Sequence, residues 1–282
     1  MNHRTSTPRA VGVIGLGAMG AGMAQSLRRA GHHVHVYDIR PEAARSFAAE
    51  GGSACATLAE LAAACDIVVS VVVNAQQTEA VLFGAGGIAA ALRPGAVFVM
   101  CSTVDPNWSI ALEARLQALG VHYLDAPISG GAARAAAGQM TMMTAGRPEA
   151  YAACEGVLDA MAAKVYRLGE QAGAGSKVKI INQLLAGVHI AVAAEAMALG
   201  LREGVAADAL YEVITHSAGN SWMFENRMAH VLAGDYRALS AVDIFVKDLG
   251  LVLDTARASK FPLPLASTAH QMFMQASTAG HG

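Results

Sequence analysis

Three glycines near the start of the sequence have the spacing of a turn that binds the pyrophosphate of a dinucleotide. Gly15, Gly17 and Gly20 follow an apolar run, residues 10–14, and precede a helical stretch, residues 20–30. In this pattern the first glycine permits a tight turn, the second lets the backbone approach the phosphates, and the third lets the helix pack closely on the strand. The helix would present free N–H groups to the phosphates. The candidate cofactor-binding turn comprises Gly15, Leu16, Gly17, Ala18, Met19 and Gly20.

A carboxylate follows the second predicted strand, residues 34–37, where it could bind the adenosine ribose. Asp38 stands 18 residues after Gly20, and its oxygens would accept hydrogen bonds from the ribose hydroxyls. Because its charge would repel a 2′-phosphate, the sequence predicts NAD in preference to NADP. Arg40 lies two residues on and could attract that phosphate. The alternative role for Asp38 is an acidic cap for the helix that begins at Pro41.

Polar residues also follow the next two predicted strands, residues 67–73 and 97–101. Val73 and Asn74 end the first of these strands, and Thr103 lies just beyond the second. Ligands of a doubly wound sheet bind beyond the carboxyl edge of its strands, so we expect all three residues to contact the cofactor. Ordinary turn chemistry, which Asn and Thr also favour, is the alternative.

A loop rich in glycine follows the predicted strand at residues 123–126. Ser129, Gly130 and Gly131 combine a hydroxyl with exposed backbone N–H groups. Such a combination can hold a carboxylate through hydrogen bonds. Taken alone, the same sequence is more often a simple turn.

A lysine and two amide side chains recur at helical spacing in the second half of the sequence. Lys179, Asn182 and Gln183 stand at positions i, i+3 and i+4, so a helix places them on one face. A lysine with two amides beside an apolar helical stretch indicates a buried polar pocket. The alternative is a solvated lysine near the start of a helix, where a positive charge is mildly unfavourable.

The first part of the chain alternates short apolar runs with Ala-rich helical stretches. This alternation predicts a doubly wound α/β domain with parallel strands and right-handed crossovers. The predicted strands are residues 10–14, 34–37, 67–73, 97–101, 123–126, 140–145 and 165–168, with helices that include residues 20–30, 41–50 and 109–119.

The strand pattern stops after about residue 169, and only helical patterns follow. Ser176 is a candidate N-cap for a long helix over residues 177–202. Further helices are predicted over residues 207–216, 223–233, 242–260 and 264–277. The sequence therefore predicts a Rossmann domain over residues 1–168, joined by a long interdomain helix to an all-α domain over residues 169–282. The helical domain would serve substrate binding and oligomerisation.

The composition excludes several classes of protein. A net charge of −2 gives no electrostatic reason to bind nucleic acid or an anionic membrane. Hydrophobic residues make up 54% of the chain and charged residues only 15%, so little charge is left to cover the exterior. This balance predicts that some surface is buried between subunits of a homodimer or homotetramer.

The sequence also bears on the compartment. Residues 184–201 are almost wholly apolar, but they contain Glu195, and a carboxylate at mid-bilayer costs about 2.5 kcal/mol or more. Residues 1–9 lack the apolar core of a signal peptide. The four cysteines have no metal-ligand spacing and are interpreted as small buried residues in a reducing compartment. We expect a soluble cytoplasmic protein without a metal site.

Four motifs together resemble the β-hydroxyacid dehydrogenase (3-hydroxyisobutyrate dehydrogenase-like) family. They occur in the family's order and span the chain from residue 11 to about residue 250. The motifs are Gly15-Leu-Gly-Ala-Met-Gly20, Asp125-Ala-Pro-Ile-Ser-Gly-Gly131, Gly173-Ala-Gly-Ser-Lys-Val-Lys179 and Phe245-Val-Lys-Asp-Leu249. The resemblance implies NAD(P)-dependent oxidation of a hydroxy acid.

Mapped by motif, the resemblance implies that Lys179 is the general acid/base and that Asn182 orients the substrate or the lysine. Ser129, Gly130 and Gly131 would hold the substrate carboxylate. Lys247 would approach both the nicotinamide and the substrate, and Thr103 would contact the cofactor. A lysine with a pKa near 10.4 is protonated at pH 7, so burial and a second ammonium, that of Lys247, would favour the neutral base.

One departure narrows the resemblance to a branch of the family. The usual KxxNN motif reads Lys179-Ile-Ile-Asn182-Gln183 here, which leaves the substrate contact expected at Gln183 open. This glutamine, Leu184–His189, Asn220–Asn226 and the motif Leu239–Asp248 resemble the L-threonate dehydrogenase branch, whose members usually continue somewhat past the position of Gly282. The branch implies oxidation of L-threonate at C2 to a 2-oxo acid.

Other functions are weighed against this one. Within the class, the alternatives are 3-hydroxyisobutyrate dehydrogenase and tartronate-semialdehyde reductase. Outside it, the alternatives are a catalytically silent nucleotide-binding module and a membrane-anchored protein. Lys179 argues against the silent module, and Glu195 argues against the membrane anchor.

Overall fold

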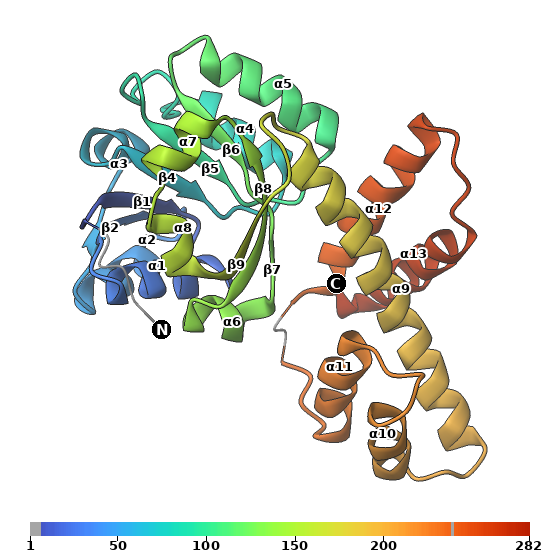
Figure 1. Cartoon of the computed structure of the whole chain (residues 1–282). Helices are drawn as coiled ribbons and strands as arrows, with labels where there is room; N and C mark the ends of the chain where they lie inside the picture. The colour runs from blue at the N-terminus through green and yellow to red at the C-terminus, as the bar shows by residue number, and fades with distance from the viewer. Residues whose placement is uncertain (1–6, 238–239) are drawn as a thin grey trace. The chain divides into compact units, whose positions relative to one another are not determined.

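The structure of the chain is a computed structural model that describes residues 7–237 and 240–282 (Figure 1). It divides into two compact units, Met1–Lys179 and Ile180–Gly282. The domain boundary after residue 168 stays a prediction. Residues 1–6 of the N-terminal segment, and Leu239 at the start of the last motif, lie outside the described residues.

The first unit contains a nine-stranded sheet in the order β3-β2-β1-β4-β5-β6-β8-β7, with β9 paired to β8. Strands β1 to β6 pair in parallel, as predicted. The strands are β1 (Ala10–Ile14), β2 (His33–Tyr37), β3 (Ser53–Ala54), β4 (Ile67–Ser70), β5 (Val97–Met100), β6 (His122–Asp125), β7 (Ile128–Ser129), β8 (Met140–Gly146) and β9 (Ala162–Arg167).

The expectation of a wholly parallel sheet is wrong for one part of it. Strand β8 runs antiparallel to both β6 and β7. Residues 130–139 connect β7 to β8 and contain only the short helix α6 (Gly131–Ala137). A parallel return needs a crossover of a dozen residues or more, so this short connection reverses the chain direction instead.

Helices cover both faces of the sheet because alternate residues of the central strands are buried on opposite sides. In β5, Val97 and Val99 belong to one hydrophobic cluster, whereas Phe98 and Met100 belong to the other. The first cluster is completed by α1 (Gly20–Arg29), α2 (Pro41–Ala49), α6, α7 (Pro148–Ala153) and α8 (Val157–Met161). The second is completed by α3 (Leu58–Ala64), α4 (Ala75–Phe83) and α5 (Pro106–Gln117). The first unit is the doubly wound domain that the sequence predicts.

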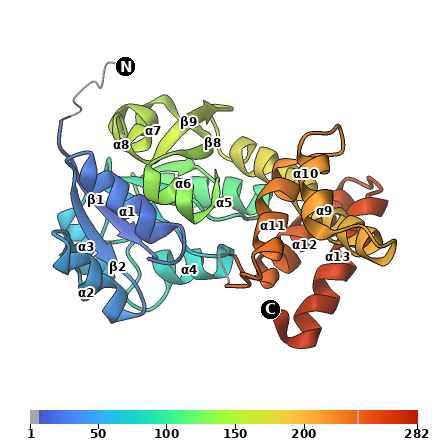
Figure 2. The same cartoon turned by 90° about the horizontal axis from the view of Figure 1, so that it is seen from below.

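The second unit is all helical in the part that the structure describes, as predicted (Figure 2). It contains most of α9 (Ala174–Arg202), then α10 (Ala207–Thr215), α11 (Trp222–Leu232), α12 (Val242–Ala258), α13 (Pro264–Ala276) and a terminal turn, η1 (Ser277–His281). Its larger hydrophobic cluster joins α9, α12 and α13, where the rings of Phe245 and Phe273 stack 5.1 Å apart. A smaller cluster joins α9, α10 and α11.

Helix α9 begins at Ala174, three residues before the predicted start, so Ser176 lies within its first turn and is not its N-cap. By length and composition α9 could cross a membrane, although 28% of its most apolar window is buried inside the protein. Burial of three cysteine thiols raises the pKa of Cys65, Cys101 and Cys154 to about 12. These three are buried as the sequence predicts, whereas the fourth cysteine, Cys55, is only half-buried, so the prediction is wrong for it.

Candidate functional site

The pairing register aligns the carboxyl ends of the parallel strands, and this edge carries most of the predicted site residues. Ile14 pairs with Tyr37 and with Ser70, Ser70 pairs with Met100, and Met100 pairs with Asp125. The residues that follow these five strand ends therefore lie along one edge of the sheet. They include the glycine turn, Asp38, Val73, Asn74, Thr103 and the Ser129–Gly131 loop.

The glycine turn has the geometry expected of its three glycines. Gly15 has a φ of +91°, which disfavours a side chain, and its N–H donates to the carbonyl of Tyr37 at 2.9 Å. A Cβ at Gly20 would overlap the carbonyl oxygen of Gly15. At Gly17, by contrast, a Cβ would meet no atom of the described residues within 4 Å. The turn is thus tightly packed beneath Gly20 and open above Gly17, as a backbone that approaches a phosphate requires.

Asp38 holds the glycine turn from the end of β2. Its carboxylate accepts hydrogen bonds from the Leu16 N–H at 2.6 Å and from the Arg40 N–H at 2.8 Å. The Arg40 guanidinium lies 3.3 Å from the same carboxylate. Burial by itself would raise the pKa of the Asp38 carboxyl, but the hydrogen bonds from Arg40 and Leu16 outweigh it and hold the pKa below its ordinary value. An ionised carboxylate therefore stands beside the turn and is paired with the arginine.

Two further edge residues have local roles that the turn interpretation anticipates. Strand β4 ends at Ser70, so Val73 and Asn74 lie beyond it and not at its end as predicted. The Asn74 side chain caps α4 by accepting from the Gln77 N–H at 2.8 Å, and the Val73 N–H donates to the Gln77 side chain. Thr103 is half-buried after β5. Cofactor contacts from Val73, Asn74 and Thr103 stay predictions.

A buried carboxylate fixes the first turn of α9 to the sheet. Asp125 ends β6 with no exposed surface, and its Oδ2 accepts from the backbone N–H groups of Gly173 and Ser176 at 2.8 and 2.9 Å. Its Oδ1 accepts from the Ser176 hydroxyl at 2.7 Å. Free N–H groups at a helix N-terminus need acceptors, and Asp125 supplies them from 48 residues away in the sequence. This long-range cap explains why α9 begins before Ser176.

The same turn is packed directly on the sheet backbone. A Cβ at Gly175 would overlap the carbonyl oxygen of Met143 and stand 2.9 Å from that of Asp125, so a side chain is excluded there. A second buried acid, Glu113, accepts from the Ala172 N–H at 3.1 Å. Residues 172–176 are thereby held to β6, β8 and α5. No sequence pattern indicates Glu113, and Asp125 enters only as the first residue of the motif Asp125–Gly131, without a role as a cap.

Lys179 follows Ser176 by three residues, so the Asp125 cap sets where this lysine stands relative to the sheet edge. Its side chain is buried, with 6% of the residue surface exposed. This burial rules out the alternative of a solvated lysine, and a polar pocket formed with Asn182 and Gln183 stays a prediction. Asn182 and Gln183 follow on the same helix, and Gln183 is also 6% exposed.

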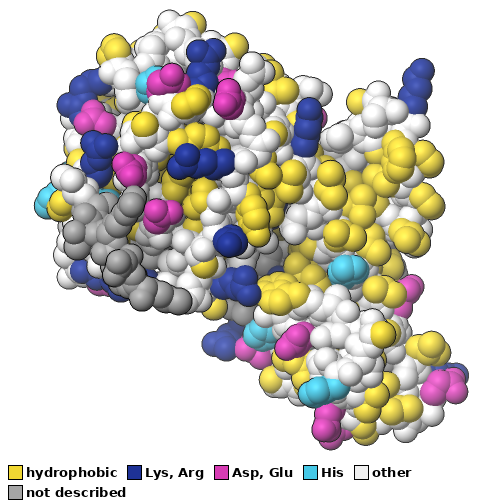
Figure 3. All heavy atoms as spheres, in the orientation of Figure 1, with side chains coloured by type: hydrophobic (Ala, Val, Ile, Leu, Met, Phe, Trp, Pro, Cys, Tyr) yellow, Lys and Arg dark blue, Asp and Glu magenta, His cyan; other side chains and the backbone are white. Residues whose placement is uncertain are grey.

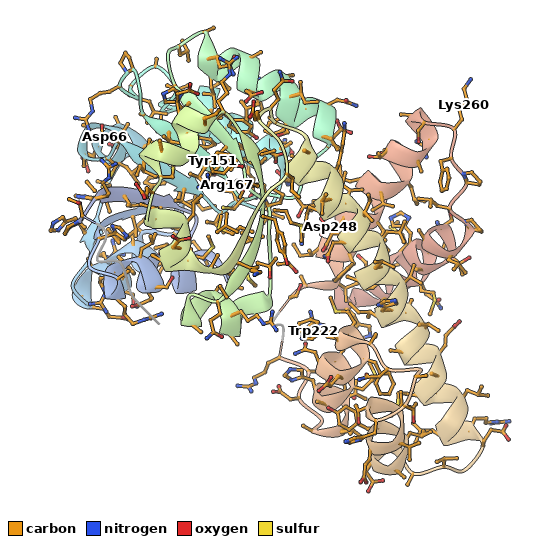
Figure 4. The ribbon with its side chains drawn as sticks, viewed as in Figure 1. Asp66, Tyr151, Arg167, Trp222, Asp248 and Lys260 are labelled. Atoms are coloured by element: carbon orange, nitrogen blue, oxygen red, sulfur yellow. The ribbon has the colours of Figure 1, made fainter. Side chains whose placement is uncertain are left out.

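In the second unit the remaining candidate residues form one polar chain between α9 and α12 that includes Asp248, which Figure 4 labels. The Lys247 ammonium lies 2.8 Å from Oδ1 of Asp248, which is only 2% exposed. The Gln183 amide donates to Oδ2 of Asp248 at 2.5 Å, and the Asn182 amide donates to Gln183 Oε1 at 3.0 Å. Asp248 thus pairs with the Lys247 ammonium within this unit, and an effect of Lys247 on Lys179 stays a prediction.

Candidate carboxylate-binding groups stand at the end of β7. Ser129 pairs with Thr141 of β8, is half-buried, and leads into Gly130 and Gly131, both with positive φ. Substrate binding by these three residues stays a prediction. Within residues 7–237 and 240–282, no group of three His, Cys, Asp or Glu side chains could hold a metal ion.

Comparisons with known proteins place the chain in a family. The family described as the NAD binding domain of 6-phosphogluconate dehydrogenase matches residues 10–169. The family described as NAD-binding of NADP-dependent 3-hydroxyisobutyrate dehydrogenase matches residues 173–282. The chain is 70% identical to an L-threonate dehydrogenase of Cupriavidus necator, over 97% of this chain and 92% of the relative. The chain belongs to the 3-hydroxyisobutyrate dehydrogenase-like family.

More distant relatives agree with this membership. Mouse mitochondrial 3-hydroxyisobutyrate dehydrogenase is 32% identical over 96% of this chain and 83% of its own. A crystal structure from Salmonella typhimurium, described as 3-hydroxyisobutyrate dehydrogenase, has a TM-score of 0.92 at 53% identity and covers 97% of this chain and 96% of its own. The resemblance stated from the motifs is confirmed. The protein is an NAD(P)-dependent hydroxyacid dehydrogenase whose substrate is a small hydroxy acid.

The Asp125 cap predicts a defined pH dependence of stability. Burial raises the pKa of the Asp125 carboxyl, and hydrogen bonds from Ser176 and Gly173 oppose that rise. A raised folded-state pKa stabilises the fold fully below the unfolded pKa, about 3.9, and this contribution is lost as the pH rises through the folded pKa. In urea titrations, the free energy of unfolding of the wild type should therefore fall relative to D125N between pH 4 and neutrality.

Two variants serve as controls for this measurement. D125A removes every acceptor of the cap and, like D125N, has no group that titrates there, so it should cost about 1–3 kcal/mol relative to the wild type at pH 4 and less toward neutrality. D66N changes an exposed aspartate on the same unit and should leave the pH profile unchanged. The free energy of unfolding of the wild type minus that of D125N should fall as the pH rises. A value that stays constant or rises with pH would contradict the assignment of the shift to Asp125.

Proposed function

We propose that the protein oxidises L-threonate at C2 to 2-oxo-tetronate (2-dehydro-L-erythronate), with NAD as the oxidant. The observation that carries this proposal is the 70% identity to an L-threonate dehydrogenase over 97% of the chain. An L-threonate dehydrogenase of Escherichia coli K12, 50% identical over 99% of the chain, supports the same substrate. The resemblance of the Lys179-to-Gln183 motif to this branch agrees with both relatives.

Lys179 serves as the general base in this proposal. Bound NAD supplies the acceptor for the hydride that leaves C2. The neutral Lys179 amine takes the proton from the C2 hydroxyl as the carbonyl forms, and the reverse reaction returns it. Burial of the side chain supports this role, because an amine with 6% of the residue surface exposed is kept out of bulk water. The Asp125 cap holds the helix turn from which Lys179 extends.

The remaining candidate residues bind and orient in this proposal. Ser129 and the N–H groups of Gly130 and Gly131 hold the substrate carboxylate, and Asn182 orients the substrate from the same helix as Lys179. Lys247 approaches the nicotinamide and the substrate. Gln183 supports Asn182, with which it shares a hydrogen bond of 3.0 Å. The glycine turn, Asp38, Val73, Asn74 and Thr103 bind the cofactor.

In this proposal the active protein is a homodimer or homotetramer in the cytoplasm. Apolar side chains gather over parts of α9 (Figure 3). Five exposed apolar residues recur on one face of this helix, at intervals of three, four, seven and seven: Val178, Ile181, Leu185, Val192 and Leu199. A stripe with this heptad spacing is typical of a helix that packs against another helix. Exposed apolar stripes of this length usually mark an interface.

A second candidate substrate, 3-hydroxyisobutyrate, should be compared directly with L-threonate, because a solved structure and a curated relative are described as 3-hydroxyisobutyrate dehydrogenases. The Salmonella typhimurium structure with a TM-score of 0.92 is described as 3-hydroxyisobutyrate dehydrogenase. Initial rates of NADH formation over L-threonate, D-threonate, 3-hydroxyisobutyrate, glycerate and erythronate separate the candidates. L-Threonate should give the highest kcat/KM, and a higher value for 3-hydroxyisobutyrate would replace the proposed function by the alternative.

The cofactor preference follows from Asp38 and Arg40. D38A removes an acceptor for the ribose hydroxyls and should raise the Kd for NAD about tenfold or more, while the loss for NADP is smaller. R40A should leave the Kd for NAD within threefold and weaken NADP, because it removes the one cation paired with Asp38 in the described residues. Fluorescence titration gives both constants. Tighter binding of NADP than of NAD by the wild type would overturn the interpretation of Asp38.

A further inference from the structure

We propose that Asp248 is a positioning residue that determines specificity by fixing the orientation of two consecutive carboxamides. Through Gln183 it orients Asn182 so that the oxygen of this side chain, Oδ1, is placed to accept a hydrogen bond from the substrate. The chemical group selected is a hydroxyl on the carbon chain of a polyhydroxy acid. The inference rests on the proposed function in placing Asn182 at the substrate.

Two charged groups at one end of this chain of hydrogen bonds have donor and acceptor roles that cannot change. An ammonium only donates and an ionised carboxylate only accepts. Lys247 and Asp248 are such a pair, with Nζ 2.8 Å from Oδ1. The ammonium supplies the compensating charge that a carboxylate needs at 2% exposure, between the core residues Phe245 and Leu249. The second oxygen of Asp248 is then an acceptor in a fixed place.

This acceptor fixes Gln183. A carboxamide has an NH2 end and an oxygen end, and only the NH2 end can bond to a carboxylate. Gln183 accordingly donates from Nε2 to Asp248 Oδ2. Its Oε1 is thereby turned to Asn182, whose Nδ2 donates to it at 3.0 Å. A flipped Gln183 would face the carboxylate with its oxygen and Asn182 with its NH2 group, so both bonds would be lost.

The polarity continues to the end of the chain of hydrogen bonds. One Nδ2 hydrogen of Asn182 bonds to Gln183, which sets the orientation of the carboxamide and places its oxygen Oδ1 on the other side from Gln183. An oxygen accepts, so its natural ligand is a donor such as a hydroxyl. An analogue that lacks the hydroxyl leaves a polar group without its partner, which is the strong form of discrimination in binding sites. The Asp248 carboxylate on α12 thus sets the preference of Asn182 on α9 for a substrate hydroxyl.

The coupling between Asp248 and Asn182 also depends on the length of the Gln183 side chain. The residue spans from α9 to Asp248 on α12 and is buried at 6% exposure. Asparagine, the usual residue of the KxxNN motif, is shorter by one methylene, so its amide would withdraw by about 1.5 Å from Asp248. A hydrogen bond of ordinary length tolerates a much smaller change. The departure at position 183 is therefore what couples Asp248 to Asn182.

The test compares two substrates that differ only in the selected groups. L-Threonate and 2-hydroxybutanoate share the carboxylate and the C2 hydroxyl, but 2-hydroxybutanoate lacks the hydroxyls at C3 and C4. In Q183M and in D248N, kcat/KM for L-threonate should fall at least tenfold more than kcat/KM for 2-hydroxybutanoate, chiefly through KM. The double variant should lose no more selectivity than either single one, because both break the same chain.

Controls separate positioning from a loss of folding. Q183M keeps the length and the apolar body of the side chain and leaves the Lys247–Asp248 pair intact. D254N changes an exposed aspartate of the same helix, paired with Arg257, and should leave the selectivity within twofold of the wild type. Equal losses for both substrates in Q183M, or an unchanged selectivity in both variants, would overturn the proposal.

A readout without substrate keeps this inference separate from the proposed function. The Gln183 side-chain NH2 resonances, assigned from the Q183M spectrum, should exchange slowly with solvent in the wild type and at least tenfold faster in D248N. Slow exchange together with a wild type that does not oxidise L-threonate would refute the proposed substrate alone. Fast exchange in the wild type would refute the fixed orientation, whatever the substrate.

Discussion

The capping of α9 by Asp125 is the interaction on which the rest of the structure depends. A fully buried carboxylate at the end of β6 accepts three hydrogen bonds from Gly173 and Ser176. Burying a carboxylate is costly unless donors surround it, and the free N–H groups at a helix end are costly unless acceptors meet them. Each requirement satisfies the other here. The result is a helix whose first turn belongs to the sheet domain.

A second buried carboxylate, Asp248 of α12, holds side chains further along α9. Asp125 fixes the turn before Lys179, and Asp248 fixes the amides just after it. Both acids contact α9 from other elements, β6 and α12. The candidate base and the candidate substrate-orienting amide are thus each held by an acid at a distance in the sequence. The main candidate groups of the proposed chemistry extend from one long helix, supported at two points.

Much of this architecture can be predicted from the sequence, because apolar periodicity reports burial. The helices of the second unit end within two residues of their predicted positions, and the strands β1, β2 and β5 within one. Residues of the glycine turn were identified because their spacing is itself the geometric requirement. Short helices of five to seven residues, such as α3 and α8, are missing from the prediction, because so few residues carry no clear period.

The features that could not be predicted from the sequence depend on contacts between residues that lie far apart in it. The start of α9 was predicted three residues late because its cap, Asp125, lies 48 residues before Gly173. Asp248 was not singled out because its partner Gln183 lies 65 residues away. The reversal of β8 follows from the short connection after β7, and no periodicity reports strand direction. Local patterns show which residues are buried, whereas the site depends on which buried residues meet.

The most direct test of the account is the effect of removing the amine at position 179. In K179A, stopped-flow turnover should fall at least about a hundredfold, the size of a lost general base, while the Kd for NAD from fluorescence titration stays within threefold. K177A, an exposed lysine of the same helix turn, is the matched control and should keep the wild-type rate. A K179A enzyme that turns over near the wild-type rate would contradict the central role given to this lysine.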